Sequence, residues 1–457
     1  MKFPLINLLP EPLRRDLHGD EGIQKIATNV AWLVFDYALR LGVSFLVLVW
    51  LARHLGPRDF GAYSYALALI TLLAAVATLG LNTIAVRDIV KHPEQKHEIL
   101  GTAFMLKILG GIVGILLAFT VATMAKPGES NAVLRSMVVI ISFGFLFRSM
   151  DVVDIWFQSQ VLSKYTVIAR SAASLLANVL RVVLIVRNAP LVAFAWMALI
   201  EIGSEGLALL VAYRAAGGRV SRWRTVAATG RRLFADSWPL ALAGLAVAAY
   251  MRIDQVMLGQ LLGDRSVGIY SASVRLAALW YFIPNALVPS VFPAIIRARQ
   301  VDPETYRVRM QALYGILALI SICVALIVTM ARGPIVSLLY GADYQEAAGV
   351  LGLHIWAGLF VSLGVASQRF LLAENLAKVA SVRTFLGCAT NILLNALLIP
   401  PMGIRGAAVA TLASYAIATF SIGLHRDGRP QALMMLKSVC LAGLFSYARG
   451  RITGRRQ

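Results

Sequence analysis

Long apolar runs separated by short polar segments follow one another along almost the whole chain. A helix needs about 20 mainly apolar residues to cross the hydrocarbon core of a bilayer. Twelve runs of about this length can be counted, at residues 28–52, 62–86, 99–124, 132–153, 166–186, 191–213, 235–262, 267–296, 310–331, 346–372, 379–400 and 405–425. The pattern predicts an all-α polytopic membrane protein with about 12 transmembrane helices. The eighth run contains Pro284, Pro289 and Pro293, so we expect that helix to be kinked or broken.

The composition supports the membrane class. The chain is 59% hydrophobic and 14% charged, with a mean hydropathy of +0.73, whereas soluble domains are about half apolar and about a quarter charged. The three cysteines lie in apolar runs, which favours packing over disulfides or a metal site. Residues 1–27 lack the apolar core of a cleavable signal peptide.

The basic residues predict an orientation. The net charge is +20, and in a membrane protein basic loops on the cytoplasmic side explain it better than nucleic-acid binding. With a cytoplasmic N-terminus, the inner segments hold 29 lysines and arginines and the outer segments hold eight. We therefore expect both termini to be cytoplasmic. Residues 432–447 are predicted to form a helix at the inner interface rather than a thirteenth span, because spanning would put the basic tail outside.

A repeated turn divides the chain into two halves. WLARHLGPRDFGAYSYA (residues 50–66) is matched by MLGQLLGDRSVGIYSAS (residues 257–273) at a constant offset of 207 residues. Since six spans separate the copies, they start on the same side of the membrane as parallel repeats. Gly56 and Gly61 would allow a tight outer turn and close helix approach.

The repeat predicts two six-helix lobes around a central cavity, related by a pseudo-two-fold axis along the membrane normal. The expected organisation is a cytoplasmic segment (1–27), an N-lobe (28–213), a basic linker (214–234), a C-lobe (235–425) and a basic cytoplasmic tail (426–457).

Ionisable residues inside the spans are the candidate functional groups, because burying a charge at membrane depth is costly without a cavity or a partner. The candidates for binding an anionic head group in the cavity are Arg40, Arg170, Arg181, Arg252 and Arg275, with Asn178 beside them. The candidates for ion coupling are Asp36, Glu201, Glu205 and Asp254.

Structural alternatives to these roles remain open. Asp36 and Arg40 are spaced for an i,i+4 pair that would neutralise itself. Glu201 and Glu205 could instead pair with Arg170 or Arg181 as structural links between adjacent spans. The fourth run ends in RSMDVVDIWFQSQ, whose charged residues could form a solvated helix end, and Lys107 could extend to the inner surface.

Four segments together resemble the polysaccharide-transporter branch, the O-antigen-type oligosaccharide flippases, of the multidrug/oligosaccharidyl-lipid/polysaccharide exporter superfamily. They are LARHLGPRDFGAYSYALALITLLAAVATLGLN with VRDI, DIWFQSQVLSKY, RIDQVMLGQLLGDRSVGIYSASVRL and NILLNALLIPPMGIRGAAVATLASYA. The resemblance covers residues of about 25–425. It implies two six-helix bundles and transport of an undecaprenyl-pyrophosphate-linked oligosaccharide from the inner to the outer leaflet of a bacterial inner membrane.

The expected protein is thus an alternating-access flippase without enzymatic activity, cofactor or metal. Its expected partners are the lipid-linked oligosaccharide and membrane lipids, with polysaccharide polymerase or chain-length machinery as further candidates. One alternative is a drug/cation antiporter of the same superfamily, which should have an acid-rich cleft. Another is a peptidoglycan-precursor flippase, whose relatives carry arginines in spans 1 and 2, where this chain offers Arg40 and none before Arg87. A membrane glycosyltransferase would need a large outer loop, and none is expected.

Overall fold

The computed structural model describes the backbone of residues 21–124 and 129–440, and the side chains of these residues except 21–40, 124–131, 163 and 299–301. In this part of the chain the regular structure is α-helical or 3-10, with no strand. The all-α prediction is confirmed, because the apolar runs fold into long helices.

The N-terminal half contains the helices α2 to α9. Their bounds are α2 (Glu21–Ala77), α3 (Leu81–Lys91), α4 (Lys96–Met124), α5 (Glu129–Ser142), α6 (Gly144–Phe147), α7 (Val152–Ser159), α8 (Ser163–Val186) and α9 (Leu191–Ala215). The C-terminal half contains α10 (Ala227–Leu262), α11 (Asp264–Leu279), α12 (Phe282–Val301), α13 (Pro303–Tyr340), α14 (Ala347–His354), α15 (Ala357–Ala373), α16 (Ala377–Met402), α17 (Ile404–Phe420) and α18 (Arg429–Val439).

The helices account for the predicted membrane crossings. Within the described residues, 11 helical segments are long and apolar enough to span a membrane, and the first of these, Leu41–Lys91, contains a turn at Gly56. The eighth crossing is interrupted at Trp280 and Tyr281, just before Pro284, as its prolines predict. The sequence did not predict the break after Ala77 in the second crossing.

The two copies of the repeated segment adopt the same turn. Gly56 has φ 70° and ψ 171°, and Gly263 has φ 84° and ψ 176°. Glycine is favoured at positive φ because it has no Cβ atom. Gly341 and Gly403 also have positive φ and make helical turns at the same end of the molecule, where Gly403 lies near Leu262. We call this the glycine-turn end.

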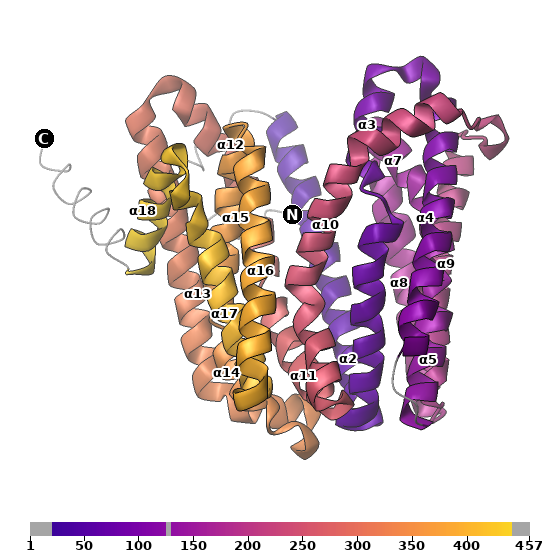
Figure 1. Ribbon diagram of the computed structural model, residues 1–457. Helices are drawn as coiled ribbons and strands as arrows, with labels where there is room; N and C mark the ends of the chain where they lie inside the picture. The colour runs from indigo at the N-terminus through magenta and orange to yellow at the C-terminus, as the bar shows by residue number, and fades with distance from the viewer. Residues whose placement is uncertain (1–20, 125–128, 441–457) are drawn as a thin grey trace, which may run out of the picture.

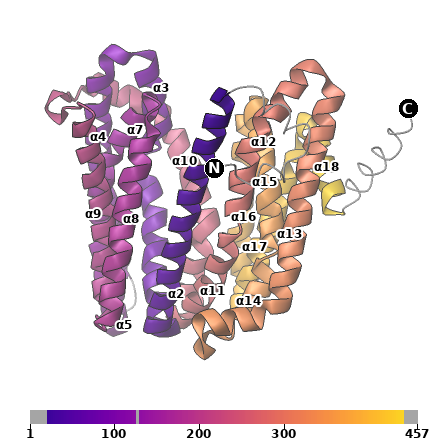
Figure 2. The same ribbon diagram turned by 180° about the vertical axis from the view of Figure 1, so that it is seen from behind.

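The two halves of the chain form two bundles that lie side by side (Figures 1 and 2). At the glycine-turn end, α2 of the N-terminal half packs on α11 of the C-terminal half. A Cβ atom added at Gly61 would collide with the backbone of Asp264, and one added at Gly268 would collide with the backbone oxygen of Pro57. The repeated turns therefore pack against each other across the boundary between the halves.

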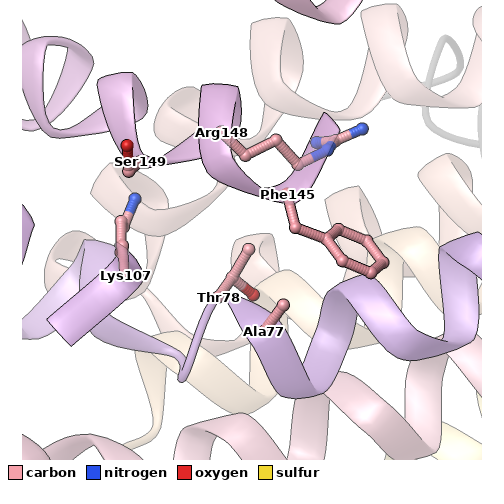
Figure 3. Close-up of a pocket in the computed structure, with 6 residues that line it drawn as sticks. All are labelled: Ala77, Thr78, Lys107, Phe145, Arg148 and Ser149. Atoms are coloured by element: carbon pink, nitrogen blue, oxygen red, sulfur yellow. The ribbon is translucent and has the colours of Figure 1, made fainter. Parts of the chain in front are cut away.

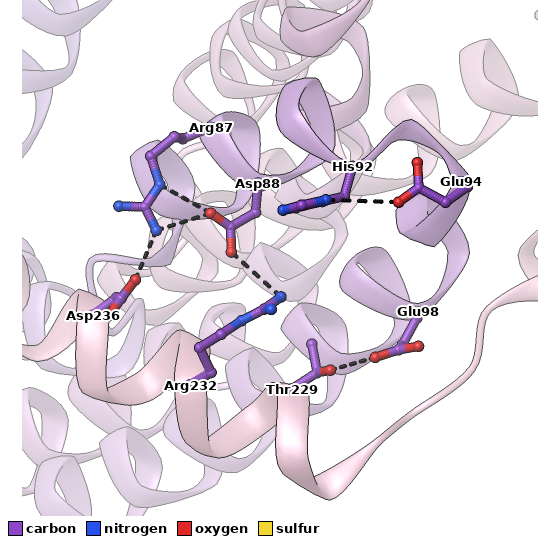
Figure 4. A network of polar contacts seen from close by, with 8 residues as sticks. All are labelled: Arg87, Asp88, His92, Glu94, Glu98, Thr229, Arg232 and Asp236. Carbon is purple, nitrogen blue, oxygen red and sulfur yellow. Dashed lines mark hydrogen bonds and ion pairs between the residues drawn. The ribbon is translucent and has the colours of Figure 1, made fainter.

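The opposite end, which contains residues 214–226, is called the linker end. Residues 227–234, expected to belong to the linker, form the first two turns of α10. These turns pack on α3 and α4 of the N-terminal half. Figure 4 shows the polar contacts there: Arg87 pairs with Asp236 at 2.7 Å, and Arg232 lies 3.6 Å from Asp88.

Near the C-terminus, α18 packs against α13 through hydrogen bonds. Tyr314 donates to Gln431 at 2.9 Å, and Gln311 donates to Ser438 at 2.8 Å. This helix begins at Arg429, three residues before the predicted interfacial helix, and residues 441–447 of that prediction lie outside the described residues. At the start of α13, Asp302 accepts hydrogen bonds from the side chain and backbone of Thr305 and from the backbone of Glu304, which lower the pKa of its carboxyl group.

Candidate functional site

Three arginines from the two halves of the molecule lie near one another inside the membrane-spanning region. Arg275 on α11 lies within electrostatic range of Arg252 on α10 and of Arg181 on α8. We call these three residues the arginine cluster. Like charges repel one another in an apolar environment, so a grouping of cations at membrane depth favours the binding of anionic groups.

Arg275 links the C-terminal half to the N-terminal half. It donates a hydrogen bond to Ser64 of α2 at 3.2 Å, and its guanidinium lies 4.8 Å from the ring centroid of Phe60. Such a cation–π contact stabilises a cation without neutralising its charge. No ion pair of the described residues includes Arg275 or Arg252. The cationic excess of the cluster therefore comes from α10 and α11.

Arg181 is the member of the cluster that has a carboxylate partner. It pairs with Glu201 of α9 and donates to the side-chain oxygen of Asn178 at 3.3 Å. Asn178 in turn donates to Ser44 of α2 at 2.9 Å. These contacts join three helices of the N-terminal half, so Arg181 and Asn178 contribute to packing here.

Arg170 lies outside the arginine cluster, in a group of carboxylates. Its guanidinium contacts Glu205 at 2.6 Å, Asp154 at 3.4 Å and Asp151 at 3.6 Å. The structural pairing considered for Glu201 and Glu205 is thus present for both residues. Of the candidates in the fourth crossing, Asp154 is buried rather than solvated, and it accepts a hydrogen bond from Gln158 at 3.0 Å.

Asp254 is a buried carboxylate in the C-terminal half. Tyr270 of α11 donates to one of its oxygens, and the backbone N–H of Gln255 donates to the other at 2.7 Å. The Tyr270 hydroxyl also lies 3.2 Å from Thr411 of α17. Among the described residues, no ion pair includes Asp254. Hydrogen bonds from neutral groups hold this acid directly, and Arg252 lies within electrostatic range of it.

The remaining two candidates are on the first crossing. Asp36 and Arg40 belong to α2, but their side chains lie outside the described residues. Their expected i,i+4 pairing and their roles in coupling and substrate binding stay predictions.

Lys107, which could have extended to the inner surface, is buried, with 2% of its surface exposed. Its ammonium group donates to Asn82 at 2.7 Å. Figure 3 shows it pointing toward Ser149 in a hollow that is also lined by Arg148 and Phe145. The hollow has almost no free volume, so this lysine is enclosed by the N-terminal bundle rather than presented to a ligand.

Two tyrosines at matching positions of the repeat have polar partners that the sequence analysis did not identify. Tyr63 lies within hydrogen-bonding reach of Arg181, whereas Tyr270 contacts Asp254. Their constant offset was visible in the sequence, but their partners come from helices distant along the chain. The same position thus contacts a cation in one half and an anion in the other.

Comparisons with known proteins agree with this fold. At 24% identity, the chain is similar to a probable low-salt glycan biosynthesis flippase of Haloferax volcanii, over 83% of this chain and 78% of that protein. It is 22% identical to a putative O-antigen transporter of Shigella flexneri, over 84% of this chain and 94% of that one. Both relatives match most of the chain, so the similarity extends across both halves.

The fold also resembles solved transporter structures. The lipid II flippase MurJ in an inward closed conformation has a TM-score of 0.75 at 12% identity, covering 91% of this chain and 93% of that one. An inward-facing multidrug resistance MATE family transporter has a TM-score of 0.66 at 14% identity, covering 88% and 96%. At these identities the likeness shows the fold alone. Residues 26–299 match the family described as polysaccharide biosynthesis protein, and the chain belongs to this family.

Proposed function

We propose that this protein is an alternating-access flippase for an undecaprenyl-pyrophosphate-linked oligosaccharide repeat unit. The similar proteins named as a glycan biosynthesis flippase and as an O-antigen transporter support this substrate class. The arginine cluster is the observation that carries the proposal. A diphosphate supplies the anionic charge that these side chains lack, and guanidinium groups bind phosphate oxygens through paired hydrogen bonds.

Within the cluster, we assign diphosphate binding first to Arg252 and Arg275. Neither has a carboxylate partner among the described ion pairs, and Arg275 reaches from α11 of the C-terminal half to α2 of the N-terminal half. Arg181 and Asn178 would complete the wall of the site. Because Arg181 is paired with Glu201, its charge would be only partly available to the diphosphate. Arg170 is occupied by three carboxylates and would stabilise the N-terminal bundle instead.

The drug/cation antiporter is the second candidate function. It would require a carboxylate free to bind an organic cation, and the described glutamates at membrane depth are paired with arginines. Asp254 lacks such a pair but is buried behind Tyr270 and Gln255. The arrangement therefore favours an anionic cargo.

The proposed orientation in the membrane, and with it the direction of transport, follows from the distribution of basic residues. The count of 29 basic residues against eight supports a cytoplasmic linker end and an outer glycine-turn end. In this proposal both termini are cytoplasmic and the protein lies in the bacterial inner membrane. The halves contact each other at the linker end, where α10 packs on α3 and α4, and at the glycine-turn end, where the backbones of α2 and α11 touch. The contacts at the glycine-turn end would close the outer side in this state, and transport would require them to separate.

Asp254 is our first candidate for ion coupling. Glu201 and Glu205 are each paired with an arginine, whereas Asp254 accepts hydrogen bonds from neutral groups. A carboxylate held in this way can bind a proton or a small cation without breaking an ion pair. Binding of a proton or cation would alter the hydrogen bond from Tyr270 of α11 to Asp254. Through Tyr270, it would also affect the contact with Thr411 of α17.

Flipping by the purified protein in liposomes tests the proposal. Loss of a hydrogen bond to a charged group costs about 1.5–3 kcal/mol, so Arg275→Ala should slow flipping roughly 10- to 100-fold. Arg265→Ala is the matched control, because Arg265 lies on the same helix, is exposed and pairs with Glu346. Equal flipping by wild type and Arg275→Ala would contradict the assignment, and absence of flipping by wild type would contradict the function.

A further inference from the structure

A groove lined only by apolar side chains lies in the C-terminal half between α11, α13 and α14. Its volume is about 380 Å³, within the usual range of ligand pockets. The lining side chains are Leu276, Leu279, Trp280, Val324, Val328, Ile335, Leu351 and Ile355. Five of them are partly exposed, so the groove opens to the surface.

The surroundings of the groove indicate that it opens to the membrane. On α13, Ile327 is 65% exposed and Met330 is 86% exposed, at positions next to the lining residues. Large apolar side chains exposed to this degree on a membrane-spanning helix are typical of a surface that contacts lipid chains. An apolar chain from the bilayer can therefore enter the groove.

Arg275 lies immediately before the first groove residue on α11, Leu276. It is 12 residues from the turn at Gly263, or about 18 Å along the helix. Half of a bilayer's hydrocarbon core measures about 15 Å, so Arg275 and the groove lie near mid-membrane depth. A cation without a carboxylate partner, which contacts Ser64 and Phe60 of α2, thus lies at the same depth as the apolar groove and next to it along α11.

We propose that this groove binds the polyprenyl chain of the transported lipid while the arginine cluster binds its diphosphate. This inference rests on the proposed function and adds a subsite for the tail. Phospholipids of the bilayer keep their phosphates at the surface, whereas a lipid being translocated carries its anionic group through the membrane interior. The pairing of cation and groove at this depth matches the second kind of lipid.

Two substitutions on neighbouring residues of α13 test the tail subsite. Val328→Phe fills the groove, whereas Ile327→Phe adds the same ring on the exposed surface beside it. Binding of undecaprenyl diphosphate and of geranyl diphosphate to the purified full-length protein is measured for each variant. Val324→Leu, a smaller change in the same groove, serves if Val328→Phe does not fold.

We expect Val328→Phe to weaken binding of undecaprenyl diphosphate at least tenfold and to leave geranyl diphosphate unchanged, because the short chain does not need the groove. Ile327→Phe should behave as wild type with both probes. Equal weakening of both probes, or no change for undecaprenyl diphosphate, would overturn the tail subsite. Normal chain-dependent binding without flipping in liposomes would overturn the proposed function alone.

Discussion

Replacing Gly61 or Gly268 by alanine should separate the two halves at the glycine-turn end. The new Cβ atom at Gly61 would lie 2.6 Å from the carbonyl carbon of Asp264 and 2.8 Å from the nitrogen of Gly268. Both neighbours are backbone atoms, so no side-chain rotation relieves the collision. The α11 helix would have to move away from α2.

The cost of this movement sets the expected effect. Adding a methyl group to a well-packed contact costs about 1–3 kcal/mol, which corresponds to a shift of roughly 5- to 150-fold in a conformational equilibrium. Alanine is also a better helix former than glycine, by about 1 kcal/mol. Any loss of contact between the halves would therefore occur despite a gain in helix propensity.

Spin labels at Arg58 and Arg265, which occupy matching positions of the repeat and are exposed, report the separation as a distance distribution. In a cysteine-free background, Gly61→Ala should shift this distribution to longer distances. Gly244→Ala is the control, because nothing lies within 4 Å of a Cβ atom at that position. Gly259→Ala should have a smaller effect, because its Cβ atom would meet the ring of Tyr65, which can rotate.

Unchanged distances in both Gly61→Ala and Gly268→Ala would refute the reasoning, since the same methyl group cannot fit against backbone atoms without movement. A shift in Gly244→Ala of the same size would refute it as well, because the effect would then come from helix propensity.

Three further predictions concern orientation, pairing and coupling. In intact cells, a membrane-impermeant thiol reagent should label a cysteine at Arg58 and spare one at Ser221, and the reverse would invert the topology; Pro57 is unsuitable because it is buried. Glu201→Gln should leave Arg181 without its carboxylate partner and lower the free energy of unfolding by about 3 kcal/mol, which a lower melting temperature would report. An unchanged melting temperature would contradict a structural role for this pair. Asp254→Asn should keep the fold but abolish the dependence of flipping on an ion gradient, and retained dependence would exclude this residue from coupling.

The span count, the helical class and the glycine turns could be predicted because each depends on neighbours along the chain. Hydrophobic runs determine membrane crossings, and the turns at Gly56 and Gly263 need only a local positive φ. The partners of buried charges could not be predicted, because they depend on which helices pack together. Arg170 could be assigned to Glu205 or to the substrate from sequence alone, whereas packing of α8 on α9 brings it to the carboxylate.

The repeat explains why the two halves share a scaffold and differ in chemistry. The positions that match at an offset of 207 residues include the glycines, one arginine (Arg58 and Arg265) and one tyrosine of the turn, but not the charges at membrane depth. Ala68 occupies the position that corresponds to Arg275, and Val47 the one that corresponds to Asp254. Arg275 and Asp254, which form no ion pair among the described residues, are therefore both features of the C-terminal half. If the cluster binds the diphosphate and Asp254 binds the coupling ion, both events act on α10 and α11, and α11 contacts α2 at the closed end. Ligand binding and opening of that end would then be coupled through these two helices.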